Sequence, residues 1–214
     1  MSVLPRVVII YKRDSRIMYL LVYVDDLILT GNHSPTIKSF VTTLDKEFAI
    51  KDLGRLNYFL GLEVTYTQNG LFLNQSKYTM DILTRANMLD AKPAPTPLSS
   101  NVSFVSAGTV AFGLHYSRPI TTSLLSYSDA DWDRCLETRR STYGYSIFLG
   151  GNLISWSAKK QLTVARSSCE SEYRAMANTA AEIVWITHLL QELHALPSDR
   201  PTLLCDNQSA IFLT

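Results

Sequence analysis

The sequence predicts a mixed fold of the α/β (α+β) class, divided into two small domains. Short runs of β-branched and aromatic residues recur along the chain and are separated by turn residues, as in strands. Apolar residues at helical spacing cover 167–193, and a proline-rich segment interrupts both patterns. With 214 residues, of which 46% are hydrophobic, each half can bury a core. We therefore expect domains at 1–90 and 109–214, joined by a linker at 91–108.

The first strands surround a pair of acidic residues. In the stretch LLVYVDDLILTGN, Asp25 and Asp26 stand inside an otherwise apolar run. A polar break upstream predicts a hairpin before this stretch. We expect one strand to end at Val24 and the next to start at Leu27, with both acids in the tight bend between them.

The remainder of the first domain is expected to contain two helices and a second hairpin. Ser34 followed by Pro35 is typical of a helix N-cap with proline at the first helical position, and the apolar spacing carries this helix to Phe48. An Asn-Gly pair at 69–70 is a strong hairpin signal. A short helix is predicted within 76–89.

The second domain shows a β-β-β-α-β-α order. The expected elements are a strand at 123–127, two strands around Gly150–Gly151, a helix at 167–193, a strand at 202–205 and a helix capped by Asn207. This order argues for a mixed sheet covered by helices.

Acidic residues mark the ends of several of these elements. Asp129 and Asp131 come at the end of the first strand, Glu172 in the first turns of the long helix, and Asp206 after the last strand. Ligand sites of α/β sheets gather at such positions. Each acid also has a purely structural interpretation, as a turn residue, a helix N-terminal acid, or an N-cap pair in the case of Asp206 and Asn207.

Clustered carboxylates repel one another unless a cation lies between them. Hard oxygen ligands suit Mg²⁺ or Mn²⁺, and two such ions roughly 4 Å apart support in-line hydrolysis of a phosphodiester. A shared site for Asp129, Glu172 and Asp206 would therefore point to this chemistry.

Composition excludes little. The formal charge of +1 gives no basic field over the whole chain, so contact with nucleic acid would need local patches. The basic pairs at 139–140 and 159–160 could contact phosphates, but we interpret them as solvated surface residues. We expect Trp156 and Trp185 to pack between sheet and helix.

The cysteines and the apolar segments bear on cellular location. The three cysteines form no C-x-x-C pair, and neither a signal segment nor a membrane span is apparent. We expect an intracellular protein of the cytoplasm or nucleus, without a membrane partner; the oligomeric state stays open.

Long phrases of the sequence resemble a known family. LLVYVDDLILTGN, FAIKDLGRLNYFLGLEV and LFLNQSKYTMDIL are similar to the reverse transcriptase of plant copia-type LTR retrotransposon Pol polyproteins. Two further stretches resemble the RNase H domain of the same polyproteins: the one from YSDADWDRCLETRRSTYGYSIFLGG to HLL, and LLCDNQSAI. The resemblance covers nearly the whole chain outside its extreme N-terminus and the linker.

The resemblance implies a partial reverse-transcriptase palm and thumb, followed by a C-terminally truncated RNase H-like mixed sheet with helices. Asp25 and Asp26 would be the carboxylates of the palm hairpin. Polymerases of the family also need a carboxylate from an earlier strand and the fingers, which this chain is expected to lack. We therefore expect no polymerase activity and non-functional palm acids.

For the second half, the resemblance assigns three metal ligands. Asp129 would be the ligand of the first strand, Glu172 that of the helix and Asp206 that of the fourth strand, with Asp131 a weaker candidate. The family implies Mg²⁺ or Mn²⁺ as cofactor and an RNA–DNA hybrid or other nucleic acid as partner. A further acid of the family would lie beyond Thr214.

Three interpretations remain open. The chain is an RNase H-type enzyme fragment, a catalytically inactive transposon relic with at most weak nucleic-acid binding, or an interaction module built on the helix at 167–193. An apparent deletion between the halves and the truncated ends favour the relic, whereas ancestry favours the enzyme fold.

Overall fold

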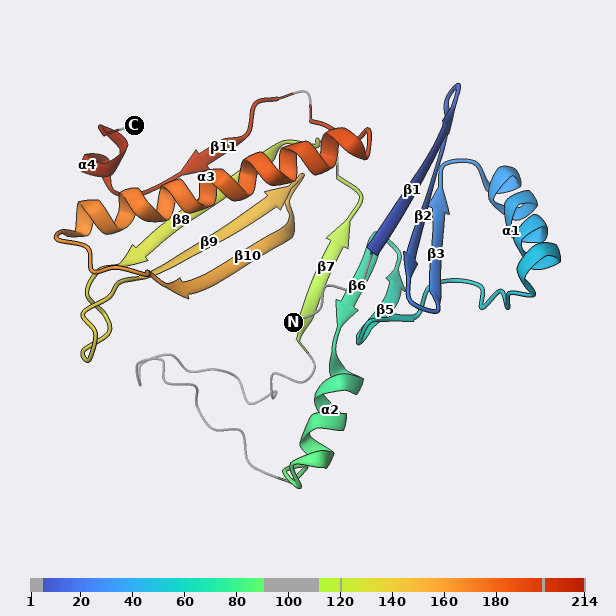
Figure 1. Ribbon diagram of the computed structural model, residues 1–214, viewed down its shortest axis with the longest axis horizontal. Coiled ribbons are helices and arrows are strands. Elements are labelled where there is room, and N and C mark those ends of the chain that lie inside the picture. Colours follow the sequence, from blue (N-terminus) through green and yellow to red (C-terminus); the bar gives the residue numbers. More distant parts are fainter. Residues whose placement is uncertain (1–5, 91–111, 120, 198, 214) are drawn as a thin grey trace. The chain divides into compact units, whose positions relative to one another are not determined.

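The computed structural model describes residues 6–90, 112–119, 121–197 and 199–213 (Figure 1). The chain divides into two compact units, Met1–Leu60 and Gly61–Thr214. The linker expected at 91–108 lies outside the described residues. The domain boundaries inferred from the sequence therefore stay a prediction. The described elements are a mixture of strands and helices, as the sequence predicts.

The first unit is an antiparallel sheet followed by a helix. Its elements are β1 (Arg6–Arg13), β2 (Arg16–Tyr23), β3 (Asp26–Gly31), α1 (Ser34–Phe48) and β4 (Tyr58–Phe59). The sheet order is β1-β2-β3. Tyr23 pairs with Asp26, so Val24 and Asp25 form a two-residue turn. The predicted bend is confirmed, but both strand boundaries lie one residue earlier than expected.

Helix α1 begins with a cap that the sequence did not suggest. The prediction of Ser34 as N-cap is wrong, because His33 holds that position and its Nδ1 accepts a hydrogen bond from the Thr36 N–H at 3.3 Å. Pro35 therefore lies in the first turn, where its missing N–H costs no hydrogen bond. The predicted end at Phe48 is confirmed.

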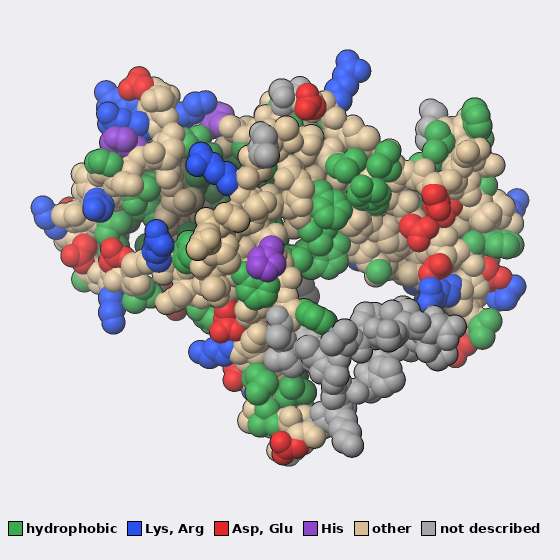
Figure 2. All heavy atoms as spheres, turned by 180° about the vertical axis from the view of Figure 1, so that it is seen from behind, with side chains coloured by type: hydrophobic (Ala, Val, Ile, Leu, Met, Phe, Trp, Pro, Cys, Tyr) green, Lys and Arg blue, Asp and Glu red, His purple; other side chains and the backbone are tan. Residues whose placement is uncertain are grey.

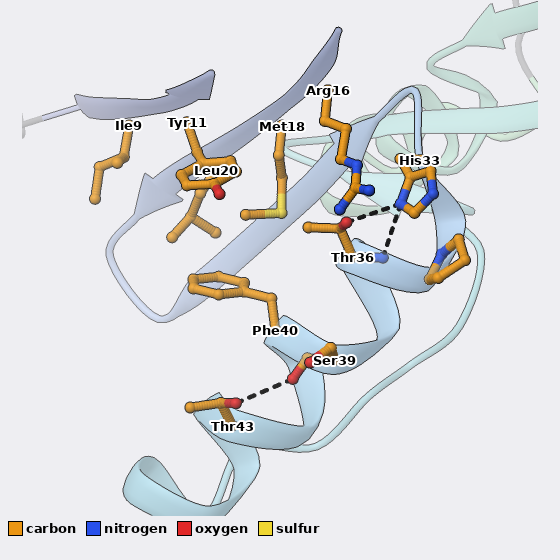
Figure 3. A pocket seen from close by; sticks show the side chains of 11 residues that line it. Ile9, Tyr11, Arg16, Met18, Leu20, His33, Thr36, Ser39, Phe40 and Thr43 are labelled. Carbon is orange, nitrogen blue, oxygen red and sulfur yellow. Dashed lines mark hydrogen bonds between the residues drawn. The ribbon is translucent and has the colours of Figure 1, made fainter. Parts of the chain in front are cut away.

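A cavity of about 660 Å³ separates α1 from the sheet (Figure 3). Its walls are largely apolar and include Met18, Leu20 and Phe40. In α1 no residue is fully buried, and Met18 and Leu20 are the buried hydrophobic side chains among the described residues of this unit. The first unit consequently has a small core.

The second unit starts with a hairpin, β5 (Leu62–Thr67) and β6 (Gly70–Asn74), followed by α2 (Ser76–Arg85). Thr67 pairs with Gly70, so the turn residues are Gln68 and Asn69, one position before the predicted pair. Strand β7 (Gly113–Ser117), which the sequence analysis missed, pairs antiparallel with β6. A Cβ at Gly70 would lie 1.9 Å from the Tyr116 carbonyl oxygen, so this close pairing requires glycine.

A second sheet with a long helix completes this unit. The elements are β8 (Leu124–Asp131), β9 (Thr142–Leu149), β10 (Asn152–Lys160), α3 (Ser168–Glu192), β11 (Thr202–Leu204) and α4 (Gln208–Ile211). The sheet order is β10-β9-β8-β11, and β11 runs parallel to β8 while the other pairs are antiparallel. The predicted order and the mixed sheet are confirmed. Asn207 caps α4 as predicted, because its Oδ1 accepts from the Ala210 N–H at 2.9 Å.

The core of this unit lies between α3 and the sheet. It consists of Leu124, Ile147, Ile183, Ile186 and Leu190, with partly buried neighbours such as Tyr145 and Leu203. Alternate residues of β8, from Leu124 to Ala130, are buried, so Asp129 and Asp131 belong to its other, exposed face. The helix thus leaves the acids of β8 accessible.

The expected packing of Trp156 and Trp185 between sheet and helix is wrong. Their side chains are 59% and 58% exposed. Ser155, the neighbour of Trp156, donates a hydrogen bond to Glu182 of α3, so Trp156 points to the opposite face of its strand. Trp185 lies two positions from buried Ile183, which turns it to the outer side of the helix.

Many large hydrophobic side chains of the described residues are exposed, and hydrophobic side chains are visible at the surface in Figure 2. Among the described residues, none of the helices is both long enough and apolar enough to span a membrane.

Candidate metal centre

Two parallel strands bring two of the predicted acids to one edge of the sheet. Strand β11 pairs in parallel with β8, and the last pair is Leu204 with Tyr127. Two residues further along the chain come Asp129, still in β8, and Asp206, just beyond the end of β11. If the register continues, the backbones of Asp129 and Asp206 lie at the same sheet edge, at the carboxyl ends of parallel strands, where α/β sheets bind ligands. The Asp129 carboxylate is nevertheless outside the group of close ligand atoms described below.

Helix α3 supplies a third acid. The helix starts after Ser167, whose Oγ accepts from the Glu170 N–H at 3.1 Å. Glu172 lies on the face that also buries Ala175 and Met176, and its side chain is only 6% exposed. Its Oε1 accepts a hydrogen bond from the Ala130 N–H of β8 at 3.1 Å. This bond fixes the carboxylate beside the end of β8.

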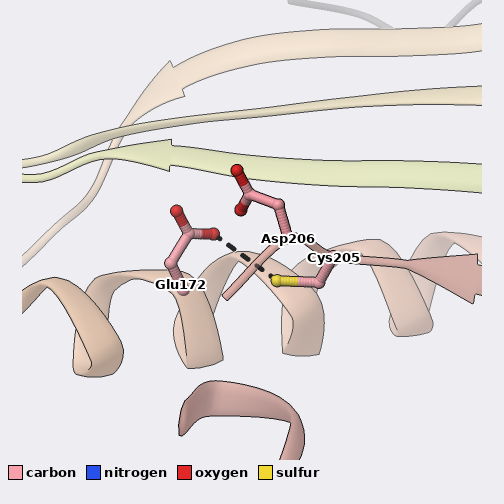
Figure 4. A group of neighbouring side chains, drawn as sticks. All are labelled: Glu172, Cys205 and Asp206. Carbon is pink, nitrogen blue, oxygen red and sulfur yellow. Dashed lines mark hydrogen bonds between the residues drawn. The ribbon is translucent and has the colours of Figure 1, made fainter. Parts of the chain in front are cut away.

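A cysteine completes the group. The potential ligand atoms of Glu172, Cys205 and Asp206 all lie within 4.8 Å of one another (Figure 4). The Cys205 Sγ lies 3.8 Å from Glu172 Oε2, as the donor of a weak hydrogen bond. Sequence reasoning missed Cys205, although its position directly before Asp206 was a signal that it would lie at the same strand end.

The electrostatics of the group disfavour negative charge. Burial raises the pKa of Glu172, and the nearby charges of Asp129 and Asp206 raise it further, against the opposing hydrogen bond from Ala130. Burial likewise raises the pKa of the Cys205 thiol, as do the charges of Glu172 and Asp206. A divalent cation between these side chains would reverse the effect, because its charge favours their deprotonated forms.

Two other acids of the same region have different partners. Asp131 forms an ion pair with Arg134, and Asp133 forms one with Arg139. Neither belongs to the group of Glu172, Cys205 and Asp206. Asp129 lies outside this group as well, although its charge acts on Glu172. Asp131 stays the weaker candidate because its carboxylate is already paired with Arg134.

Asp25 and Asp26 lie in the first unit, at the turn between β2 and β3, and both are exposed. The preceding residue, Val24, has a φ of 50°, a left-handed conformation that is unfavourable for a β-branched side chain. Backbone strain of this kind clusters at functional sites. Among the residues that the structure describes, however, no third potential ligand joins this pair, since the group around Glu172 is the one set of three.

Comparison with known proteins identifies the family. The family described as reverse transcriptase (RNA-dependent DNA polymerase) matches residues 6–100. The retrovirus-related Pol polyprotein from transposon RE2 of Arabidopsis thaliana is 35% identical over 95% of this chain, and that from transposon TNT 1-94 of Nicotiana tabacum is 29% identical over the same share. The chain belongs to the copia-type retrotransposon Pol polyprotein family. The inferred resemblance to plant copia-type Pol polyproteins is thereby confirmed, whereas its RNase H part stays a prediction.

This Pol chain spans only part of its longer relatives. It covers 18% of the RE2 polyprotein and 20% of the TNT 1-94 polyprotein. It covers 94% of an uncharacterized mitochondrial protein of Arabidopsis thaliana, which is 38% identical over 78% of this chain. No solved structure matches the chain significantly. Asp25 and Asp26 fall inside the stretch that matches reverse transcriptase, whereas Asp129, Glu172 and Asp206 fall outside it.

Proposed function

We propose that the second unit of this Pol chain is a ribonuclease H-type centre, which hydrolyses the RNA strand of an RNA–DNA hybrid with Mg²⁺ or Mn²⁺. The main support is the position of Glu172. A carboxylate that is 6% exposed lies beside the acids of two parallel strand ends, and the charges acting on it are both negative. Such an arrangement is costly without a cation and favourable with one.

The carboxylates of the proposed centre are suitable ligands for a hard divalent ion. Oxygen ligands from Asp129, Glu172 and Asp206 are of the type that Mg²⁺ and Mn²⁺ prefer. When bound, a pair of such ions would supply an activated water and stabilise the leaving oxygen.

The protein's own residues fix the geometry of this centre. The Ala130 N–H holds Glu172 Oε1 at 3.1 Å, which leaves Oε2 on the side of Cys205 and Asp206. The parallel pairing of β8 and β11 up to Tyr127 and Leu204 brings the chain segments that carry Asp129 and Asp206 to the same sheet edge. Because the bond from Ala130 comes from a backbone group, the Glu172 carboxylate is held in place before any ion or substrate arrives.

The first unit is proposed to contribute no metal chemistry of its own. Asp25 and Asp26 have the position of palm carboxylates in the family resemblance, but they are two exposed acids without a third ligand among the described residues. A role for this unit in contacting nucleic acid is consistent with its match to reverse transcriptase.

Cleavage of a labelled RNA–DNA hybrid by the purified chain tests the proposal. We expect Mg²⁺-dependent cleavage of the RNA strand, and a loss on the order of 100-fold in Asp129→Asn, Glu172→Gln and Asp206→Asn, because each substitution removes a charge that must meet the ion. Glu182→Gln is the matched control, since Glu182 is an acid of the same helix that accepts a hydrogen bond from Ser155 of β10.

Two outcomes would count against the nuclease. Cleavage that persists in Glu172→Gln would assign the activity to another site or to a contaminant. If the wild-type chain and all variants are equally inert, the alternative of an inactive transposon relic with at most weak nucleic-acid binding replaces the proposal.

A further inference from the structure

A thiol is an unexpected neighbour in a site for hard cations. Cys205 lies between the strand end of β11 and the carboxylate of Glu172, and its Sγ is part of the group that also contains Asp206. We propose that Cys205 makes this site bind a thiophilic divalent cation, Zn²⁺ or Cd²⁺, through Glu172, Cys205 and Asp206, in competition with Mg²⁺. This inference rests on the cation site of the proposed function but does not require hydrolysis.

The geometry suits a small tetrahedral ion. Zn²⁺ binds thiolate sulfur at about 2.3 Å and carboxylate oxygen at about 2.0–2.2 Å, which sets its ligand atoms roughly 3.5 Å apart. The Cys205 Sγ and Glu172 Oε2 are already 3.8 Å apart, and all three potential ligand atoms lie within 4.8 Å of one another. Small rotations of exposed Asp206 would close the remaining gap.

The buried carboxylate gives independent support. Glu172 is 6% exposed, so water has little access to it. The backbone N–H of Ala130 binds Oε1, whereas the contact of Oε2 among the described residues is the long one to the thiol. A buried carboxylate oxygen with so weak a partner is costly, and a cation bound at this oxygen would remove the cost.

Ligand chemistry decides which cation gains from the thiol. Mg²⁺ demands near-octahedral oxygen coordination, and a sulfur ligand adds little to its affinity. Zn²⁺ and Cd²⁺ bind thiolate strongly, and on binding the Sγ–H proton passes to solvent while a metal–sulfur bond forms. Cys205 should therefore raise affinity for these ions and leave affinity for Mg²⁺ nearly unchanged.

The two other cysteines provide internal controls. Cys135 lies 3.0 Å from the Lys160 ammonium nitrogen, and Cys169 lies in the first turn of α3. Neither belongs to a group of three potential ligands in the described part of the chain.

Titration of the full chain with Cd²⁺, followed by the ultraviolet charge-transfer absorbance of the cadmium–thiolate bond, tests this inference. We expect the absorbance in the wild type, in Cys135→Ser and in Cys169→Ser, and its loss in Cys205→Ser. By calorimetry, Cys205→Ser should weaken binding of Zn²⁺ and Cd²⁺ by roughly 10-fold or more, with little change for Mg²⁺. If Cys205→Ser fails to fold, Glu172→Gln replaces it, since it keeps the thiol and should also weaken Cd²⁺ binding.

Absorbance that survives in Cys205→Ser, or that disappears in Cys135→Ser, would overturn the assignment. Hybrid cleavage with Mg²⁺, measured on the same samples, separates this inference from the proposed function. Cys205-dependent absorbance without cleavage would refute the nuclease alone, whereas cleavage without Cys205-dependent absorbance would refute the thiophilic site alone.

Discussion

Cys135 and Cys205 are two thiols whose surroundings shift their pKa values in opposite directions. A hydrogen bond from Lys160 lowers the pKa of Cys135 to about 7, with a smaller contribution from Thr138. Burial raises the pKa of Cys205, and the negative charges of Glu172 and Asp206 act in the same direction. Thiolate reactivity at neutral pH is therefore expected at Cys135, while Cys205 needs a bound cation to lose its proton.

The pH dependence of alkylation tests the influence of Lys160. We expect the rate of iodoacetamide labelling at Cys135, followed by peptide mass spectrometry, to rise as the pH increases through about 7, because the lowered pKa makes the thiolate available there. Lys160→Gln should move this rise to higher pH, towards the usual range of thiols. Lys159→Gln, one position away, should leave it in place, and an equal effect of both substitutions would rule out the specific hydrogen bond.

Single residues of the site differ in how well the sequence predicts them. Asp129, Glu172 and Asp206 could be selected because each acid stands at the end or start of an element that the sequence indicates, and the structure brings Glu172 and Asp206 together. Their roles in binding and catalysis stay predictions. Cys205 was not selected, although it stands directly before Asp206, because a cysteine outside a metal motif does not by itself indicate a ligand. His33 was missed as N-cap because serine is the far commoner cap.

At the scale of elements, the start of α3 determines the position of Glu172. The Ser167 Oγ accepts from the Glu170 N–H at 3.1 Å, and Glu170 in turn accepts from the Arg166 N–H at 2.7 Å. The local segment Ser-Ser-Cys-Glu is thus a variant of the capping box, and it fixes the first turn from which Glu172 follows.

Removal of this cap should cost stability. We expect Ser167→Ala to lower the free energy of unfolding by about 1 kcal/mol, because the Glu170 N–H loses its acceptor. Ser168→Ala is the control, since Ser168 is already inside the helix and it is its backbone carbonyl that accepts a hydrogen bond from Ser171. Urea denaturation of both variants measures the difference, and an equal loss in the two would contradict the capping role.

Strong local patterns predicted most elements. The 25-residue helix α3, the hairpin at Gly150–Gly151 and the short strand before Asp206 all follow from periodicity and turn residues. Strand β7 was missed because its five residues have no apolar run and depend on pairing with β6. Trp156 and Trp185 were misplaced because size and hydrophobicity do not tell which face of an element a side chain occupies.

At the scale of the whole molecule, the two units differ in their cores. Met18 and Leu20 are the buried hydrophobic side chains described in the first unit, whereas a cluster of five buried residues joins α3 to the sheet of β8–β11 in the second. Burial of apolar surface is the main source of stability, so the second unit should be the more stable one.

Hydrogen exchange followed by mass spectrometry tests this difference. We expect amides of β8, β9 and α3 to exchange slowest, and those of β1–β3 and α1 to exchange by local opening at least roughly 10-fold faster. Because both sets come from one chain, each serves as the control for the other. Equal protection in the two units would show that they unfold together.

The assignment of the chain to the Pol family and the mixed strand-helix architecture were both accessible from the sequence, since long phrases and strong periodicities carry them. The proximity of Glu172, Cys205 and Asp206 was not, because it depends on the parallel register of β11 with β8 and on the face of α3 that meets them.

Anomalous diffraction from crystals of the chain soaked in Mn²⁺ would test the central claim, a cation shared by acids from β8, α3 and the end of β11, most directly. We predict anomalous density bonded to the carboxylates of Glu172 and Asp206, which disappears in Glu172→Gln. Bound Mn²⁺ found only at other carboxylates, with none at Glu172, would contradict the account.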